Sequence, residues 1–321
     1  MLRILHGTTY DFIKYWRHMA VLTVAFILLG IGSAIFKGGF PYSIEFTGGT
    51  LMQIAFTNAP DVAVVRTTLD NAGIKGAEIA TFGSARTLTI RAQGAELLAE
   101  QASGAEKVAQ QIEAALRTNT ALGEFKVDRY ESVGPRVGAE LRRGAVFAIL
   151  ISFVVTLAYL AWRFEWRFGL SAVLATAHDI LTTIAFIKLL HLEISLTVVA
   201  AILTVIGYSL NDTIIIFDRV RENLHKNRKM PFYDLLNLSV NETLPRSILT
   251  HATTLGATLS LLLLAGEVIR PFAWVMSFGI FTGTFSSIYV ASPILMWVEN
   301  KYPRANEARG AAGRNAARAR P

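Results

Sequence analysis

Cysteine is absent from the 321 residues of the sequence, so the chain can form no disulfide bond. This absence is common in bacterial envelope proteins but does not by itself define a compartment. The sequence also lacks the GxxxxGK(S/T) motif of phosphate-binding loops and the HExxH motif of zinc proteases, and its six histidines are scattered. If the protein performs work, we therefore expect the energy to come from a gradient across a membrane.

Charged residues are scarce, at 17%, whereas hydrophobic residues make up 52% of the chain and the mean hydropathy is +0.42. Several uninterrupted apolar runs reach the ~20 residues that a helix needs to cross a bilayer. These runs indicate a membrane protein with several spans. The basic pI of about 9.7 is therefore not interpreted as a sign of nucleic-acid binding.

The apolar runs predict a polytopic α-helical membrane protein with six transmembrane helices and one soluble α+β domain between the first two helices. The predicted spans are residues 19–36, 144–162, 169–190, 194–217, 246–265 and 272–298. The remaining segments are an N-terminus at 1–18, a soluble domain at 37–143, a loop at 218–245 and a disordered basic tail at 299–321. Within the loop we expect the charged end of the preceding helix and a short surface helix at 232–238.

The distribution of basic residues predicts the orientation of the chain. The segments 1–18, 163–168, 218–247 and 299–321 together carry 17 Lys and Arg against 8 Asp and Glu. The soluble domain at 37–143 carries 12 of each. By the positive-inside rule both termini lie in the cytoplasm and the domain is exported, although Arg142 and Arg143 at the outer end of the second span break this pattern.

The exported domain has the sequence pattern of a ferredoxin-like sandwich, in which two helices pack on an antiparallel sheet in the order β-α-β-β-α-β. The predicted strands are residues 51–57, 78–82, 87–91 and 125–130, and the predicted helices are 61–72 and 97–116. Such a fold carries no function by itself. No paired carboxylates and no Ser/His/Asp set stand out in this domain.

Two pairs of glycines predict close approaches of the backbone. One pair ends the motif Phe46, Thr47, Gly48 and Gly49, which precedes the first strand of the exported domain. Glycine permits a positive φ and a close contact at this point. The other pair, Gly279 and Gly283, is spaced four residues apart in the sixth span, and this spacing allows two helices to pack closely.

Asp212 lies in the apolar sequence of the fourth span, about one and a half turns before the charged residues begin. Inserting a carboxylate there costs roughly 2.5–3.5 kcal/mol on insertion scales, so we expect the acid to be paired with another group or to have a function. Arg246 opens the fifth span at a similar depth, and we expect the two to form an ion pair. The arginine would favour the ionised form of the acid, whereas burial would favour its protonated form. A small change in their spacing could therefore switch the acid between the two forms, as a proton relay requires. A static pair that joins two helices, or an Arg246 that reaches to the interface, is the alternative.

Asp179 lies near the centre of the third span, and no basic residue is clearly at the same depth. The adjacent His178 is about 100° further round the helix, so we expect it to be a poor partner. We expect the acid to accept hydrogen bonds from hydroxyls such as those of Thr182, Thr204 and Ser209, or to face a partner subunit. Its role is either structural or part of the proton path.

Small and polar residues precede and follow Asp212 in the fourth span. The stretch comprises Gly207, Ser209, Asn211 and Thr213. These side chains could solvate the acid or hold water beside it, and they could equally hold neighbouring helices together.

Five motifs in chain order resemble the SecF branch of the SecD/SecF family of protein-export membrane proteins. They are FTGG at 46–49, VGP at 133–135 with LRRGA at 141–145, AHD at 177–179, GYSLNDT at 207–213 with DRVREN at 218–223, and TLPRS at 243–247. The motif at 207–213 is long and specific, whereas FTGG alone would be a weak signal. The resemblance extends over nearly the whole chain except the tail.

The resemblance implies the fold of half of an RND-type transporter, with a partner, SecD, that supplies six further spans. It also implies association with the SecYEG channel, with YajC and YidC, and with a translocating preprotein in the bacterial inner membrane. In this family the proton-motive force helps to draw the preprotein outward after the SecA ATPase has pushed it. The family's proton-passage residues correspond to Asp212 and Arg246. No enzymatic activity and no cofactor are expected.

Two other functions are compatible with the same pattern. A half-size RND-like exporter of a lipid or small hydrophobic molecule would form a homodimer and would need no second six-span chain. If the protein were instead a structural scaffold of a membrane complex, substitutions of Asp212 and Arg246 would act only by changing how much of the complex is present. In each case the basic tail at 299–321 could contact anionic lipid, and no nucleic acid is expected as a partner.

Overall fold

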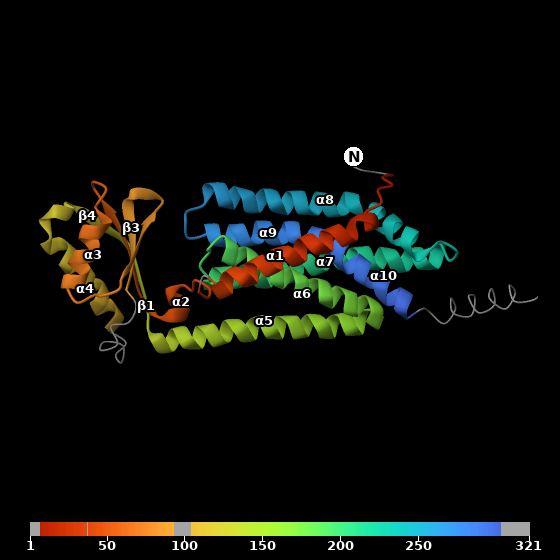
Figure 1. Cartoon of the computed structure of the whole chain (residues 1–321), viewed down its shortest axis with the longest axis horizontal. Coiled ribbons are helices and arrows are strands. Elements are labelled where there is room, and N and C mark those ends of the chain that lie inside the picture. Colours follow the sequence, from red (N-terminus) through yellow and green to blue (C-terminus); the bar gives the residue numbers. More distant parts are fainter. Residues whose placement is uncertain (1–6, 37, 93–103, 303–321) are drawn as a thin grey trace, which may run out of the picture.

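The computed structural model describes residues 7–36, 38–92 and 104–302. The disordered tail predicted at 299–321 is wrong for residues 299–301, which belong to the last helix, and the part from residue 303 lies outside the described residues. The first turns of the helix predicted at 97–116 lie outside them as well. The molecule is elongated, with a small α+β domain at one end of a bundle of long helices (Figure 1). The first and last described residues lie towards the opposite end of the bundle from this domain.

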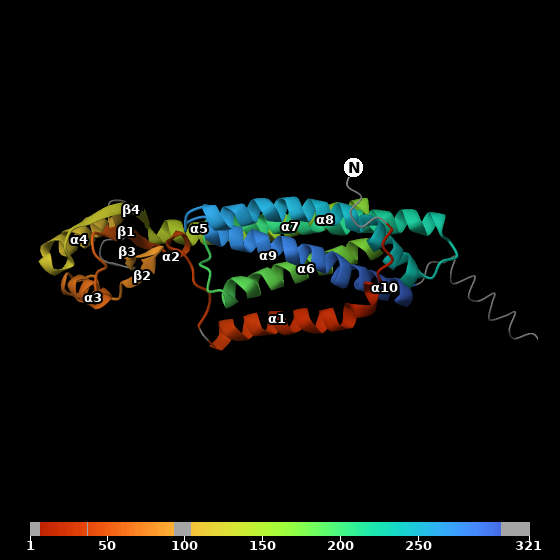
Figure 2. The same cartoon turned by 90° about the horizontal axis from the view of Figure 1, so that it is seen from above.

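The α+β domain has the predicted β-α-β-β-α-β order. Its elements are β1 (Gly49–Phe56), α3 (Val62–Asn71), β2 (Glu78–Phe82), β3 (Ser84–Ala92), α4 (Gly104–Thr118), η2 (Thr120–Leu122) and β4 (Phe125–Val133). The strands form one antiparallel sheet in the order β2-β3-β1-β4, with Met52 of β1 opposite Ile90 of β3 and Tyr130 of β4. Both helices lie on one face of the sheet (Figures 1 and 2).

The core of this domain follows from alternation along β1. Every second side chain of this strand is buried, among them Met52, Ile54 and Phe56. The helices cover them with the apolar residues expected from the sequence, including Val65, Leu69, Val108, Ile112 and Leu116. Each fully buried side chain of this size contributes about 1.5–3 kcal/mol by leaving water.

Six helices are long and apolar enough to cross a membrane, as predicted. They are α1 (Trp16–Phe36, preceded by η1, Ile13–Tyr15), α5 (Pro135–Arg163), α6 (Trp166–Leu189), α7 (Leu196–Lys226), α8 (Phe232–Leu264) and the run formed by α9 (Arg270–Ser286), a π turn (Ser287–Ala291) and α10 (Ser292–Lys301). A single turn of helix, α2 (Ile44–Thr47), joins the exported domain to the bundle.

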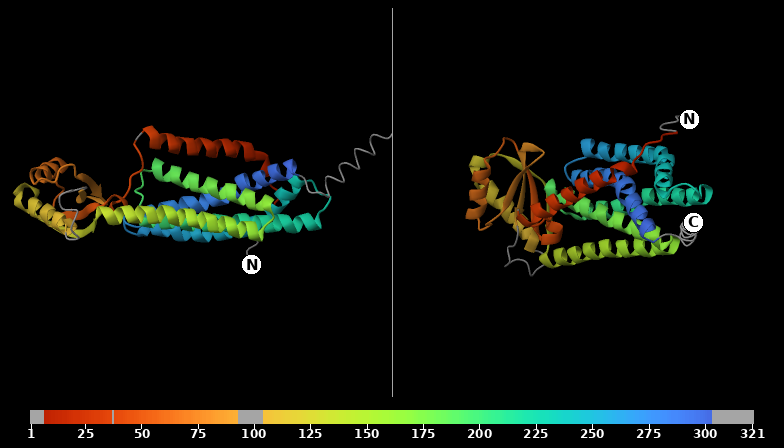
Figure 3. Two further views of the ribbon diagram at one scale, coloured as in Figure 1. Left: turned by 90° about the horizontal axis from the view of Figure 1, so that it is seen from below. Right: turned by 45° about the vertical axis from the view of Figure 1, so that its right-hand side comes forward.

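The six spans divide into a centre and a periphery. Helices α6, α7 and α9 are half buried or more within this one chain, whereas α1, α5 and α8 expose most of their surface. The three peripheral helices lie at separate corners of the bundle (Figures 1 and 3). Their exposed faces carry large apolar side chains such as Leu29, Phe147 and Leu249, which suit a lipid environment or a second chain.

Glycines set the closest helix contacts, as the spacing of Gly279 and Gly283 predicts. A Cβ atom on Gly279 would lie 2.2 Å from Cγ2 of Val205 in α7, and one on Gly283 would lie 3.0 Å from Cβ of Ser209. Between α1 and α6, a Cβ on Gly30 would lie 2.3 Å from Cβ of Ala185. The hydrophobic effect does not drive helices together in lipid, so helix association there depends on close packing. Small residues permit it because they let two backbones approach each other.

The helices extend further than the predicted spans. Helix α5 begins at Pro135 rather than at 144, and only residues 227–231 of the loop predicted at 218–245 lie outside α7 and α8. Hydropathy marks where the apolar surface ends, not where the helix ends. The additional turns of α8 are held by Leu235, Leu236 and other apolar residues that join the core of the bundle.

Candidate functional site

Asp212 is buried inside the bundle, with 3% of its surface exposed. Its Oδ2 accepts a hydrogen bond of 2.7 Å from the Ser287 hydroxyl in the π turn. Its Oδ1 accepts a second bond from the Ser247 hydroxyl of α8. Each hydroxyl compensates part of the cost of placing a carboxylate in a region of low dielectric constant.

Asp179 of α6 is also buried, with 1% exposed. Its Oδ2 accepts a bond of 2.8 Å from the Ser286 hydroxyl and another from the Ser209 hydroxyl of α7. The predicted contact with Ser209 is therefore confirmed. The expectation for His178 is wrong, because its Nδ1 lies 3.0 Å from Oδ1 of Asp179. Although the two Cα positions differ by about 100° round the helix, the ring turns back towards the acid.

The other two hydroxyls expected near Asp179 do not reach its carboxylate. Thr182 donates instead to backbone carbonyls of its own helix, those of His178 at 3.0 Å and Asp179 at 3.1 Å. Thr204 is exposed on α7 and donates to the carbonyl of Ala200 at 2.8 Å. Threonines in helices commonly form such bonds to the preceding turn, which leaves fewer hydroxyls for the interior.

Residues from four helical segments therefore meet in one buried polar region, which we call the acid cluster. It comprises Asp179, Ser209, Asp212, Ser247, Ser286 and Ser287. Ser209 and Asp212 share one face of α7 because they are three residues apart. Gly283 admits Ser209 because it has no side chain to block it. The arrangement can shield both acids from lipid, and each carboxylate accepts hydrogen bonds from two hydroxyl groups.

Arg246 is not part of the acid cluster. It is exposed and lines a hollow of about 320 Å³ with Asp218, Arg219, Glu222, Glu242 and two uncharged neighbours. Among the described residues no ion pair joins Arg246 to Asp212, so the expected pair does not form in this structure. The two residues have the predicted similar depth, but the next residue, Ser247, turns towards Asp212, because successive residues differ by about 100°. Depth in the membrane could be predicted from the sequence, whereas the direction of the side chain could not.

The residues that bracket Asp212 in the sequence take different directions. Ser209 joins the acid cluster, Thr213 is buried, and Gly207 and Asn211 lie on the exposed face of α7. Three members of the acid cluster, Ser247, Ser286 and Ser287, were not predicted from the sequence. Ser247 stands in the TLPRS motif directly after Arg246, and the two others end the run TGTFSS at 282–287, where only the glycine spacing was interpreted.

The N-terminal end of α7 is fastened to the segment that leads into the α+β domain. The backbone N–H of Leu196, the first residue of α7, donates to Oε2 of Glu45 at 2.6 Å. Ile194 pairs with Tyr42 in a parallel bridge. In this bridge the backbone N–H of Ile194 donates a hydrogen bond of 2.7 Å to the carbonyl of Pro41. A carboxylate at the start of a helix is favourable because the exposed N–H groups carry partial positive charge. We call these contacts the outer latch.

A second contact strengthens the outer latch. The guanidinium of Arg91 in β3, which is largely buried, lies 2.6 Å from Glu193 in the turn before α7 and 3.3 Å from Glu78 in β2. This ion pair runs directly from the sheet to the bundle. The α+β domain and the segment that leads into it therefore contact the N-terminal end of the helix that carries Asp212 in two places.

The motif of Phe46, Thr47, Gly48 and Gly49 forms the junction between the domain and α5. Gly48 has a φ of 75° and Gly49 a φ of 121°, both of which favour glycine. A Cβ on Gly48 would lie 2.8 Å from Cα of Pro135, the first residue of α5. Phe46 is buried beneath this contact, so the glycines allow the outer end of α5 to close against the strand.

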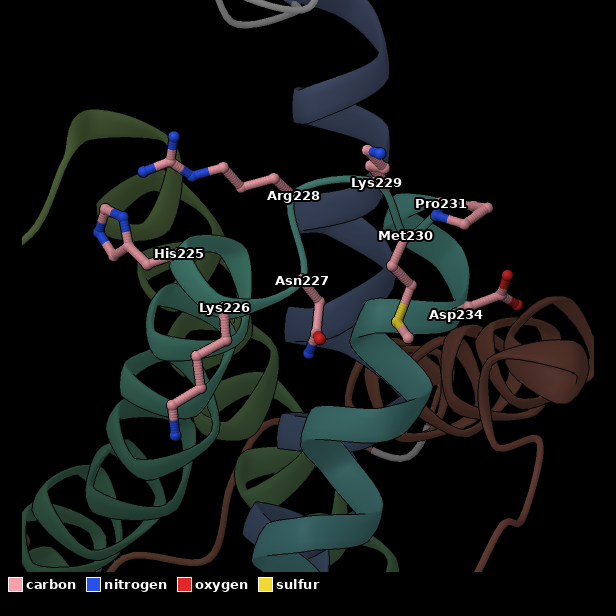
Figure 4. A pocket seen from close by; sticks show the side chains of 8 residues that line it. All are labelled: His225, Lys226, Asn227, Arg228, Lys229, Met230, Pro231 and Asp234. Carbon is pink, nitrogen blue, oxygen red and sulfur yellow. The ribbon is translucent and has the colours of Figure 1, made fainter.

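A larger hollow of about 890 Å³ lies at the turn between α7 and α8, far along these helices from the acid cluster (Figure 4). Its lining is mostly basic and polar: His225, Lys226, Asn227, Arg228, Lys229, Met230, Pro231 and Asp234. The side chains of Arg228 and His225 point away from Met230 in the close view. Within residues 7–36, 38–92 and 104–302 no group of three or more His, Cys, Asp or Glu could hold a metal ion.

Two family models match this sequence. The C-terminal model of the protein export membrane proteins SecD and SecF matches residues 111–301, and the model of the SecD/SecF GG motif matches residues 33–60. The chain is 59% identical over 309 residues to the protein translocase subunit SecF of Gemmatimonas aurantiaca, covering 96% of this chain and 92% of that one. It is 38% identical over 289 residues to the SecF subunit of Rickettsia felis, covering 90% of each.

The fold is similar to solved structures of SecDF. The crystal structure of SecDF from Thermus thermophilus, described as a translocon-associated membrane protein, aligns with a TM-score of 0.80 at 35% identity. The alignment covers 94% of this chain but 40% of that one, so this chain spans about two fifths of the length of the solved relative. A second SecDF structure, in a super-membrane-facing form, aligns with a TM-score of 0.67 at 34% identity.

Proposed function

The chain belongs to the SecF branch of the SecD/SecF family of protein-export membrane proteins, and we propose that with SecD it couples the proton-motive force to preprotein translocation. SecD supplies the other half of the transporter, since SecDF relatives carry both halves in a longer chain. The complex acts at the SecYEG channel, with YajC and YidC, in the bacterial inner membrane. Both termini of this chain lie in the cytoplasm. The protein performs no chemical conversion of the preprotein.

The observation that carries this proposal is the position of Asp212. It is buried in the membrane-spanning part of α7, and the outer end of the same helix is fastened to the exported domain by Glu45. From Leu196 to Asp212 the helix rises about 24 Å at 1.5 Å per residue. A change in the charge of Asp212 alters its contacts with the π turn and α8, and α7 transmits the resulting shift to the domain.

In the proposed mechanism Arg246 supplies a positive charge beside the route that protons take between the acid cluster and the cytoplasm. It lines a polar hollow with three carboxylates, and the residue after it, Ser247, contacts Asp212. Gly207 and Asn211 lie on the exposed face of α7, where a helix of SecD would pack. A water-filled path that opens between this hollow and Ser247 would bring Asp212 into exchange with the cytoplasm.

The test is Asp212→Asn in membrane vesicles that hold this chain together with SecD and the SecYEG channel. We expect export driven by the gradient to be abolished while ATP-driven export by SecA continues, because Asn cannot carry a proton. Asp234→Asn is the matched control, since Asp234 is exposed on α8 and outside the acid cluster. Normal gradient-dependent export by Asp212→Asn would refute the proposal.

The same experiment distinguishes the alternatives. If the protein were only a scaffold, Asp212→Asn would act through the abundance of the complex, which immunodetection of the vesicles measures. A lipid exporter would transport lipid without SecD. The SecF and SecDF relatives favour protein export over both alternatives.

A further inference from the structure

Two consecutive serines contact two different buried acids. Ser286 is the last residue of α9 and contacts Asp179, and Ser287 is the first residue of the π turn and contacts Asp212. Neither serine has any exposed surface. The wider π turn closes with Ser292, whose hydroxyl donates to the carbonyl of Ser287 at 2.9 Å. Such turns occur frequently at functional sites.

Each of these serines has two acceptors within reach but only one hydrogen to donate. The Ser286 hydroxyl lies 2.8 Å from Asp179 and 3.2 Å from the carbonyl of Gly283. The Ser287 hydroxyl lies 2.7 Å from Asp212 and 2.9 Å from the carbonyl of Thr284. A rotation about the Cβ–Oγ bond therefore transfers the donated bond from the acid to the helix backbone.

We propose that Ser286 and Ser287 are positioning residues that join Asp179 and Asp212 into a single protonation unit at the π turn. This inference rests on the proposed function and adds Asp179 and the two serines to it. When Asp212 takes up a proton, its new O–H donates to Oγ of Ser287, and the hydrogen of Ser287 turns to the carbonyl of Thr284. When the proton leaves, the hydroxyl turns back to the carboxylate. No covalent bond changes apart from that of the transferred proton.

The two acids influence each other because their serines are neighbours on one backbone. A rotation or displacement of the π turn that releases Asp212 also moves Ser286 relative to Asp179. The titratable and charged groups near the cluster are His178 on α6, Arg246 and His251 on α8, and Tyr289 in the π turn. Of these only His178 contacts an acid, whereas His251 packs edge-on against Tyr208 with ring centroids 5.4 Å apart.

The inference is tested by following the protonated carboxyl band of Asp212 in infrared difference spectra of the complete complex with SecD. Loss of the band in Asp212→Asn assigns it. In Ser287→Ala we expect the protonated band to persist to a pH about one to two units higher, since one hydrogen bond to the charged form is lost. Asp179→Asn should shift the same band, because Ser286, which contacts Asp179, adjoins Ser287 on one backbone.

Control variants separate positioning from general packing. Ser277→Ala removes another buried hydroxyl from α9, one that contacts Thr258 at 3.0 Å and no acid, and should leave the band unchanged. Ser287→Thr keeps a hydroxyl and should restore much of the wild-type titration. If Ser287→Ala fails to assemble, Asp179→Asn and Ser287→Thr still decide the matter.

An unchanged titration of Asp212 in both Ser287→Ala and Asp179→Asn would overturn the inference. So would an equal shift in Ser277→Ala, which would mean that any lost hydroxyl has this effect. Failure of the proposed function has a different signature, because it would appear as normal gradient-dependent export by Asp212→Asn whatever the infrared titration gives.

Discussion

The carboxylate of Glu45 accepts a 2.6 Å hydrogen bond from the backbone N–H of Leu196, and this contact joins the segment leading into the exported domain to the first turn of α7. Sixteen residues further along the same helix stands Asp212. The contact thus connects the segment leading into the α+β domain with the helix that carries the acid cluster.

Glu45→Ala should destabilise the complex and weaken gradient-dependent export. Loss of a side chain that caps a helix start costs about 0.5–2 kcal/mol. Glu45→Gln should retain most of the stability, because an amide oxygen still accepts the bond. Thermal unfolding in detergent and vesicle export measure the two effects. Glu113→Ala, in an exposed pair on α4, is the control, and equal losses in both alanine variants would contradict the role of the latch.

A disulfide between Tyr42→Cys and Ile194→Cys should leave export intact. The two residues form a parallel bridge in the outer latch, and the chain has no native cysteine to interfere. If the outer latch stays closed while it transmits movement, a covalent bond across it should change the rate of export little. Vesicle export is measured before and after addition of a reducing agent. Export that recovers only on reduction would show that the latch must open during the cycle.

Arg246→Gln should reduce export to the level seen without a gradient, while the complex remains as stable as the wild type. Its side chain is exposed, so little packing is lost, but the positive charge in the hollow with Asp218, Glu222 and Glu242 disappears. Arg228→Gln at the α7–α8 turn removes a charge of the same kind outside this hollow and serves as the control. Arg246→Lys should retain part of the activity, since it keeps the charge.

Gly279→Ala should destabilise the bundle by about 1–3 kcal/mol, because the added methyl group would lie 2.2 Å from Val205 and the packed core must shift. Gly256→Ala on α8 is the matched control, since nothing lies within 4 Å of its added Cβ. There we expect no loss, or a gain of about 0.5–1 kcal/mol from lower flexibility of the unfolded chain. Unfolding in detergent measures both, and equal stabilities would contradict the close packing of α7 and α9.

The contact of the N-terminal lead with α8 should weaken in acid and again in alkali above about pH 10, because the hydrogen bond to Asp11 also raises the pKa of the Tyr233 hydroxyl above its ordinary value of 10.0. The Tyr233 hydroxyl, 2.7 Å from Asp11, lowers the pKa of this carboxyl below its ordinary value of 3.8. A lowered pKa means that the contact is fully present above the ordinary value and is lost as the pH falls through the lowered one. On the acid side, proteolysis of the N-terminus should therefore increase below about pH 3.8, and Asp11→Asn should remove this acid dependence.

The number of spans could be predicted because each span is a long apolar run, and the topology of the α+β domain could be predicted because its strands and helices alternate buried and exposed positions. The alternation in β1 and the apolar face of α4 correctly predict the sheet and its helices. The ends of α7 and α8 could not be predicted from hydropathy, since both helices continue past the apolar region with residues such as Val220 and Leu236. Helix ends there depend on packing between the two helices.

The acid cluster could be predicted only in part. Burial of Asp179 and Asp212 follows from their place in apolar sequence, and the contact of Asp179 with Ser209 was expected. The Ser247 and Ser287 donors could not be predicted, because their direction depends on helix rotation and on a π turn that has no sequence signal. The absence of an Asp212–Arg246 pair has the same cause.

Helix α7 is one unbroken rod of 31 residues, about 46 Å long at 1.5 Å per residue, whereas the hydrocarbon core of a bilayer is about 30 Å thick. It is therefore long enough to protrude from both surfaces of the membrane. A stiff element of this kind behaves as a lever, so a tilt imposed at its outer tip must appear, reversed in direction, at its inner tip. A factor that binds the C-terminal tip, next to Lys226, would therefore sense whether the α+β domain at the other tip carries a load.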